Sequence, residues 1–183
     1  PWQQQYVWQR EVKADAHVAM AGGVALGIVD PGGKLTLLDA FDGNEMLSGK
    51  IALPENADDV AFLRFEDVLV CAVNVPDEHN QGRVITMPVY VGAKPISGVL
   101  YGLDATSGEQ LWSTPVANQQ LRLDQPTGVP IVIACNRYQK RVKLKNNSYR
   151  TESPQLLLKV LDSRTGAVLH DSAVKNAYWA NYH

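Results

Sequence analysis

Short runs of apolar residues, separated by turns rich in Gly, Asp, Asn and Pro, recur along the chain. Three of these runs, at 34–38, 99–103 and 156–161, carry apolar residues on both alternating faces rather than on one. A strand of this kind belongs to a sheet that packs between two other layers. The pattern therefore predicts an all-β fold in which short strands form small stacked sheets.

Each of these strands leads into the same short motif, in which a Leu-Asp pair ends the strand and a Gly follows four residues after the Asp. The pairs are Asp39 with Gly43, Asp104 with Gly108, and Asp162 with Gly166. The Gly supplies the positive φ angle that closes a tight reversal, and the Asp carboxylate accepts hydrogen bonds from backbone N–H groups of the turn. The motif predicts three equivalent hairpins and gives these residues structural roles.

One position in the strand after each turn, together with a matching position near the N-terminus, sets the length of the repeat. Trp8, Leu47, Trp112 and His170 occupy it at separations of 39, 65 and 58 residues. The first separation is the length of a plain β-propeller blade of four short strands. The two longer separations place an insertion between the second and third strands of their blades, so both insertions project from one face of the ring.

The repeat predicts a single partial β-propeller of three four-stranded antiparallel blades plus one strand from a preceding blade. The parts are that outer strand, a plain blade, a blade with insertion 74–97, a blade with insertion 136–154 and the start of a further blade, at 1–12, 13–53, 54–118, 119–175 and 176–183. A ring needs at least four blades. The chain is therefore expected either to be a piece of a larger propeller or to complete its ring with another chain.

The segment 103–112, Leu-Asp-Ala-Thr-Ser-Gly-Glu-Gln-Leu-Trp, resembles the tryptophan-docking repeat of pyrroloquinoline-quinone-like (PQQ-like) β-propellers. In that family the Trp packs between adjacent blades, so the resemblance implies this role for Trp8 and Trp112. Leu47 and His170 depart from the pattern and imply less regular packing at their junctions. The resemblance also implies a bacterial protein with an extracytoplasmic, periplasmic location.

Charge and composition narrow the classes of partner. The chain contains 17 Lys and Arg and 19 Asp and Glu, which gives a net charge of -2. This net charge gives no reason to expect that the chain as a whole binds a nucleic acid or an anionic membrane. No apolar run approaches the roughly 20 residues that span a bilayer. The two cysteines, Cys71 and Cys135, lie inside apolar strand-like runs and are expected to be buried and free.

The residues that would hold a quinone cofactor cannot be matched in this chain. Quinoprotein dehydrogenases of the resembled family use an Asp base, calcium ligands and often a vicinal disulfide, whereas the Asp residues of the repeats are explained by turns. We expect no catalytic residue, no cofactor and no metal within these residues. The alternative is a fragment of a quinone-dependent dehydrogenase whose PQQ and calcium lie in other blades.

The two insertions differ in character. The third-blade insertion carries a charge of +5 over 136–154, from Arg137, Lys140, Arg141, Lys143, Lys145 and Arg150 against Glu152. This patch suits an acidic protein or another polyanion, although a solvated hairpin that blocks edge pairing has the same composition. The second-blade insertion contains the apolar, β-prone stretch 84–91, which must be covered by the chain itself or by a partner.

From these features the preferred function is a non-catalytic binding or scaffold module within a larger protein, contacting a protein partner or the remaining blades through the inserted loops. Two alternatives stay open, namely the dehydrogenase fragment and a polyanion-binding domain that uses the basic hairpin 137–150. Whether the whole protein is an enzyme is left open by this sequence.

Overall fold

The computed structural model describes residues 8–76, 84–87, 93–126, 128–143, 148–151 and 155–175. These residues form strands joined by turns and loops, and no helix occurs among them. Within the same ranges there is accordingly no helix long and apolar enough to cross a membrane. The predicted starting strand of a further blade, 176–183, lies outside the described residues.

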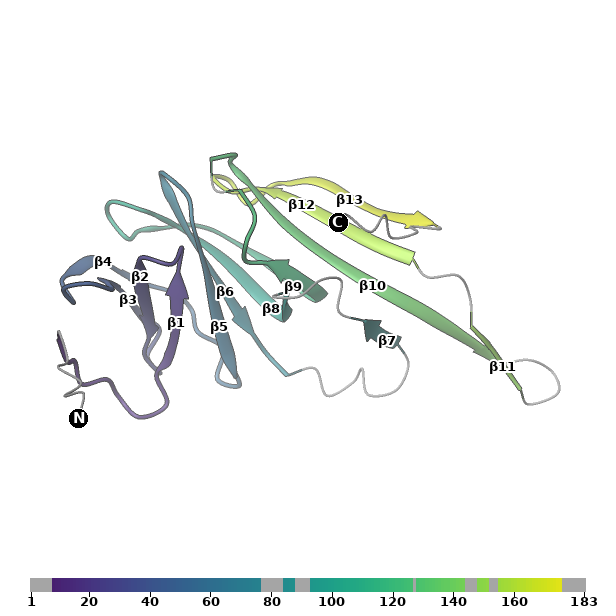
Figure 1. The fold of residues 1–183 in the computed structure, drawn as a ribbon, viewed down its shortest axis with the longest axis horizontal. Coiled ribbons are helices and arrows are strands. Elements are labelled where there is room, and N and C mark those ends of the chain that lie inside the picture. The colour runs from purple at the N-terminus through teal and green to yellow at the C-terminus, as the bar shows by residue number, and fades with distance from the viewer. Residues whose placement is uncertain are drawn as a thin grey trace, which may run out of the picture.

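The strands follow one another in three groups. The first group is a plain antiparallel meander of β1 (His17–Ala21), β2 (Ala25–Val29), β3 (Lys34–Asp39) and β4 (Glu45–Lys50). The second contains β5 (Asp59–Arg64), β6 (Val68–Asn74), β8 (Ala93–Asp104) and β9 (Gln110–Arg122). The third contains β10 (Ile131–Lys143), β12 (Gln155–Asp162) and β13 (Val168–Lys175), and Figure 1 shows the three groups side by side.

The hydrogen-bonded path runs through all three groups, but two of its links are narrow. A single parallel pair, Ala21 with Phe62, joins β1 to β5, and two pairs, Leu121 with Ala134 and Gln120 with Cys135, join β9 to β10. Five or more pairs join neighbouring strands within the first two groups. The groups are therefore separate twisted sheets that touch at their inner strands.

Side chains hold these sheets together face to face, as β6 shows. Its alternate residues Leu69, Cys71 and Val73 belong to a buried cluster shared with the first group. The intervening residues of β6, Val68, Val70 and Ala72, belong to a second cluster that reaches Val132 and Leu161 of the third group. Because successive side chains of a strand point to opposite faces, a sheet between two core layers must be apolar at every position.

Stacked four-stranded sheets with a core layer between each pair make this an all-β partial β-propeller, as the sequence predicts. We call the three groups the first, second and third blades. The end of β9 pairs with β10 and serves as the inner strand of the third blade. The predicted boundary at residue 118 lies inside β9, because residues 119–122 continue that strand and pair with both β8 and β10. Residues 8–13 carry no strand pairing in the described part of the chain.

Both cysteines are buried, as the sequence predicts, and no disulfide bond joins them. Cys71 lies at the centre of β6 with no exposed surface, and burial raises the pKa of its thiol. The thiol is therefore neutral and acts as a small apolar side chain in the core.

Candidate functional site

The turn before the last strand of each blade is built in the same way. In the turn of the second blade, one carboxylate oxygen of Asp104 accepts backbone hydrogen bonds from Thr106 (2.9 Å) and Ser107 (2.7 Å). The N–H of Gly108 donates to the Asp104 carbonyl over 2.9 Å, and Gly108 has a φ of 75°. The hydrogen bonds from Ser107 and Thr106 hold the pKa of Asp104 below its usual range.

The other two turns repeat this arrangement. Gly43 and Gly166 have φ angles of 75° and 69°, and the N–H of each donates to the carbonyl of its Asp over 2.9 Å. The carboxylates of Asp39 and Asp162 likewise accept hydrogen bonds from the N–H groups two and three residues further on. At Asp162 partial burial raises the pKa, but the hydrogen bonds from these N–H groups outweigh burial, and the pKa is lowered.

Two tryptophans dock on two of these turns, Trp112 from β9 and Trp8 from the segment before β1. The indole N–H of Trp112 donates to the Ser163 carbonyl over 2.9 Å, and its ring covers Gly166. The indole N–H of Trp8 donates to the Ala40 carbonyl over 3.1 Å, and its ring covers Gly43. In both cases the acceptor is the residue directly after the turn Asp, so each Trp contacts its turn in the same way.

At the third junction Leu47 stands in the docking position, and the backbones approach each other directly. Leu47 is buried in the core between the first two blades. A Cβ atom added to Gly49 or to Gly108 would overlap the backbone of the other strand, at Gly108 and at Ser48 respectively. The smaller side chain therefore lets β4 close onto the Gly108 turn, where a Trp would hold the two apart.

His170 occupies the fourth docking position, and the structure leaves it exposed. It pairs with Val160 just before a bulge in the ladder, as Trp112 pairs with Gly102 before an equivalent bulge. Its Nε2 lies 2.7 Å from the hydroxyl of Ser172. Residues 155–160 of the adjacent β12 are only half-buried, so in the described part of the chain this face has no covering blade.

The two insertions are joined to each other. Strand β7 (Val84–Met87) comes from the second-blade insertion, and it pairs antiparallel with residues 137–140 of β10, which belong to the third-blade insertion. Beyond this point β10 pairs with β11 (Tyr149–Thr151). Figure 1 shows β10 and β11 extending away from the stacked sheets as a ribbon. We call β7, β11 and residues 137–143 of β10 the insertion ribbon.

The basic residues predicted to form a binding patch gather on this ribbon. Arg137, Lys140, Arg141 and Lys143 lie in β10, Arg150 lies in β11, and Lys145 falls outside the described residues. Arg150 is paired in register with Val142, so its position lies between those of Arg141 and Lys143 along the neighbouring strand but on the opposite face of the ribbon. Three of the basic positions therefore lie on directly adjacent strands.

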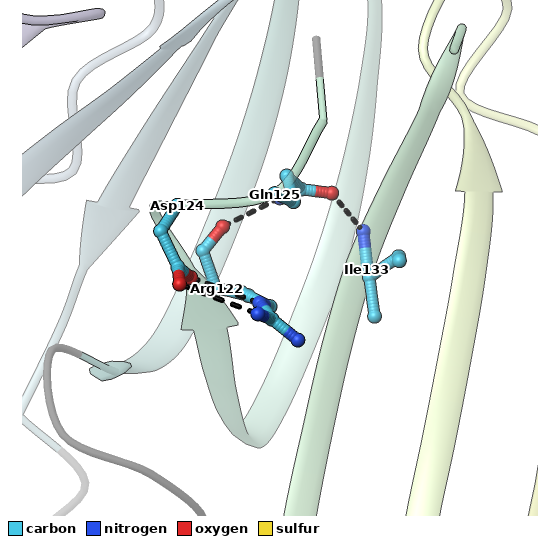
Figure 2. A network of polar contacts seen from close by, with 4 residues as sticks. All are labelled: Arg122, Asp124, Gln125 and Ile133. Atoms are coloured by element: carbon cyan, nitrogen blue, oxygen red, sulfur yellow. Dashed lines mark hydrogen bonds and ion pairs between the residues drawn. The ribbon is translucent and has the colours of Figure 1, made fainter. Parts of the chain in front are cut away.

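The sequence does not predict that polar side chains near the end of β9 are buried. The side chain of Gln125 donates from Nε2 to the Arg122 carbonyl over 2.6 Å, and its Oε1 accepts from the Ile133 N–H over 2.7 Å. The Arg122 guanidinium donates to the Asp124 carboxylate over 2.9 and 3.3 Å. Figure 2 shows that this network ties the loop after β9 to β10. It fixes the inner strand of the third blade, in which Gln119 and Gln120 are also buried.

Metal ligands are not gathered anywhere in the described ranges, since no three His, Cys, Asp or Glu side chains converge there. The carboxylates of the three repeated turns have local structural partners. Asp39, Asp104 and Asp162 each use one oxygen, Oδ1, to accept hydrogen bonds from backbone N–H groups of their own turn. These hydrogen bonds stabilise the hairpins.

Comparisons with known proteins give a likeness of fold without a family. No protein-family model matches the chain, and no curated protein matches it. BamB from Moraxella catarrhalis is similar at 14% identity over 85% of this chain and 63% of that chain, with a TM-score of 0.28. The Cps50 (Swd1) β-propeller domain from Myceliophteria thermophila is similar at 13% identity over 82% and 70%, with a TM-score of 0.22.

The chain thus spans less than two thirds of the BamB chain that it matches. TM-scores this low carry no argument about the fold or the function of this chain. The propeller assignment therefore rests on the stacked sheets, the two core layers and the three equivalent turns.

Proposed function

We propose that this chain is a non-catalytic scaffold module of PQQ-like β-propeller type that binds a protein partner through the insertion ribbon. The single observation that supports this proposal is the pairing of β7 with β10, because it joins insertions from two different blades into one surface. Four ladder pairs tie the two segments. A surface that is already ordered loses less conformational entropy on binding than two separate loops.

The charge of the ribbon points to an acidic partner surface. The third-blade insertion carries an excess of five positive charges, whereas the whole chain has a net charge of -2. Such a local excess on a projecting element speeds encounter with a negatively charged protein and selects against a positively charged one. The proposal therefore includes binding that weakens as salt concentration rises.

The resemblance to PQQ-like propellers suggests where the protein acts and what surrounds this chain. It implies a bacterial, periplasmic protein in which further blades complete the ring. His170 is exposed and β12 is half-buried, whereas the equivalent positions of the first two blades are buried against the next blade. This difference supports a further blade packed on the outer face of the third blade. In the enzyme alternative, dye-linked alcohol or sugar oxidation would appear when PQQ and calcium are added to the whole protein.

A photo-crosslinking experiment tests the ribbon as a contact surface. A photoreactive amino acid is placed at Arg141 on the ribbon or at Lys34 at the start of β3, in the cells that make the protein. We expect a discrete crosslinked protein from position 141, and we expect its loss when Arg137 and Lys143 are both changed to Glu. The same product from both positions, or no product from position 141, would contradict the proposal.

A second candidate, polyanion binding, is favoured by the register between β10 and β11. Because this register sets the Arg150 position between those of Arg141 and Lys143 on the neighbouring strand, three positive charges lie within a short length of the ribbon, spread over its two faces, and they attract phosphate or sulfate groups. Replacing Lys140, Arg141, Lys143 and Lys145 by Ser is then expected to lower the salt concentration that elutes the protein from heparin. Unchanged retention would remove this candidate.

A further inference from the structure

A pocket of about 350 Å³ opens at the base of the second-blade insertion, between the end of β6 and the start of β8. Of the ten lining residues within the described part of the chain, half have neutral polar side chains and none is charged; the polar ones are Asn74, Ser97, Asn118, Gln119 and Gln120. Ligand pockets in proteins measure about 300–1,000 Å³. The size therefore suits one small, neutral ligand.

A hydrogen-bond network holds the wall of this pocket in place. Asn74 donates from Nδ2 to the Asp58 carboxylate over 2.8 Å and accepts from the Ser97 N–H over 2.7 Å. The Ser97 hydroxyl accepts from the Asn118 N–H over 2.8 Å. Asn118 has a φ of 52° and lies in a bulge of β9 opposite Ser97, so the β8–β9 ladder bends at the pocket. The geometry of the wall is thus set before any ligand arrives.

One acceptor in this wall is left without a donor. Gln119 lines the pocket but is only 7% exposed, and its Oε1 is buried behind the pocket surface with no hydrogen-bond partner among the residues that the structure describes. Its backbone is fixed by the pairing with Ile96 across the β8–β9 ladder. A buried acceptor without a donor is costly, so it favours a ligand that donates a hydrogen bond at this point.

We propose that this pocket binds a neutral hydroxylated ligand of about the size of one sugar ring, and that the Gln119 amide turns toward the pocket so that its Oε1 accepts a hydrogen bond from a ligand hydroxyl. The C–H face of the ring lies against the apolar lining of Pro76, Pro95 and Ile96. The described residues of the lining carry no charge, so they offer no ion pair to a charged ligand. An extended peptide fits less well, because Pro95 lacks the N–H that an added strand needs from the lining strand.

The test is a titration of the whole, uniformly ¹⁵N-labelled chain, followed through the backbone N–H resonances of Ser97 and Asn118. The probes are glucose and N-acetylglucosamine, with N-acetylglycinamide as a neutral amide donor that has no hydroxyl. We expect at least one sugar to shift both resonances to saturation and N-acetylglycinamide to leave them unchanged. Absence of saturation with both sugars means that the pocket holds water only and overturns the proposal.

The variant Gln119→Leu removes the acceptor, and Gln110→Leu, at an exposed position of the same strand, is its matched control. We expect Gln119→Leu to weaken sugar binding about tenfold, whereas Gln110→Leu binds like the unmodified chain. If Gln119→Leu does not fold, Gln119→Met serves in its place. Equal affinity in the folded Gln119 variant and in the control, or a saturating shift with N-acetylglycinamide alone, overturns the proposal.

Discussion

The indole N–H of Trp112 donates a 2.9 Å hydrogen bond to the backbone carbonyl of Ser163, although the two residues are 51 positions apart. The bond joins the outer strand of the second blade to the turn of the third. The same ring covers Gly102 and Gly166, and Trp112 is 8% exposed. One side chain therefore supplies both buried area and a directional contact between two blades.

Replacing Trp112 by Ala is expected to lower the free energy of unfolding by about 3–5 kcal/mol, because it leaves a large cavity at this junction. Trp112→Phe keeps most of the ring but leaves the Ser163 carbonyl unsatisfied, at a cost of about 1–3 kcal/mol. Urea unfolding measures both. The neighbouring Leu111 is 47% exposed, and Leu111→Ala should stay within about 0.5 kcal/mol. Equal losses at 111 and 112 would contradict the docking role.

Gly166 and Gly23 separate the cost of backbone conformation from the cost of docking. Both have positive φ angles, 69° and 76°, but an added Cβ lies 2.6 Å from the Trp112 ring at Gly166 and meets nothing within 4 Å at Gly23. Gly23→Ala should cost about 1–2 kcal/mol, and Gly166→Ala about 1–3 kcal/mol more.

The same pair gives a control for the origin of the difference. In a Trp112→Ala background, Gly166→Ala should cost no more than Gly23→Ala, because the ring that it displaces is gone. Chemical denaturation of the single and double variants provides the comparison. An excess that persists without Trp112 would show that some other contact restricts Gly166.

The turn carboxylates of Asp104 and Asp162 are expected to make the free energy of unfolding depend on pH in acid. The pKa values of Asp104 and Asp162 are lowered in the folded chain, so protons bind more tightly to the unfolded chain. Their contribution is complete above the unfolded pKa of about 3.9 and is lost as the pH falls through the lower folded values. In the double variant Asp104→Asn and Asp162→Asn, stability measured by urea unfolding should fall less steeply below pH 4. An unchanged slope would assign the acid sensitivity to other groups.

Cys71 should be unreactive in the folded protein. Its thiol is fully buried, and burial raises its pKa, so neither access nor the thiolate form is available for alkylation. Iodoacetamide at pH 8 is expected to label Cys71 only after denaturant is added, as peptide mass spectrometry would show. Rapid labelling without denaturant would mean that the core between the first two blades opens readily.

The Asp-x-x-x-Gly turns were predictable because their geometry depends on neighbouring residues. A carboxylate that accepts N–H groups two and three residues ahead and a Gly with positive φ need no distant partner. The burial of residues 35–38 and 100–103 was also predictable, since a strand that is apolar on both faces has to be covered on both faces. The same reasoning identified Cys71 and Cys135 as buried.

The tertiary structure decided which distant segments meet. No local pattern indicates that residues 84–87 pair with 137–140, or that the inner strand of the third blade is the end of β9. Nor does the polar sequence of Gln119 and Gln120 predict their burial. Register between distant strands depends on how blades stack, and burial of a polar side chain depends on what covers it. The repeat and its turns are thus properties of the sequence, whereas the insertion ribbon and the neutral pocket exist only once the blades are packed.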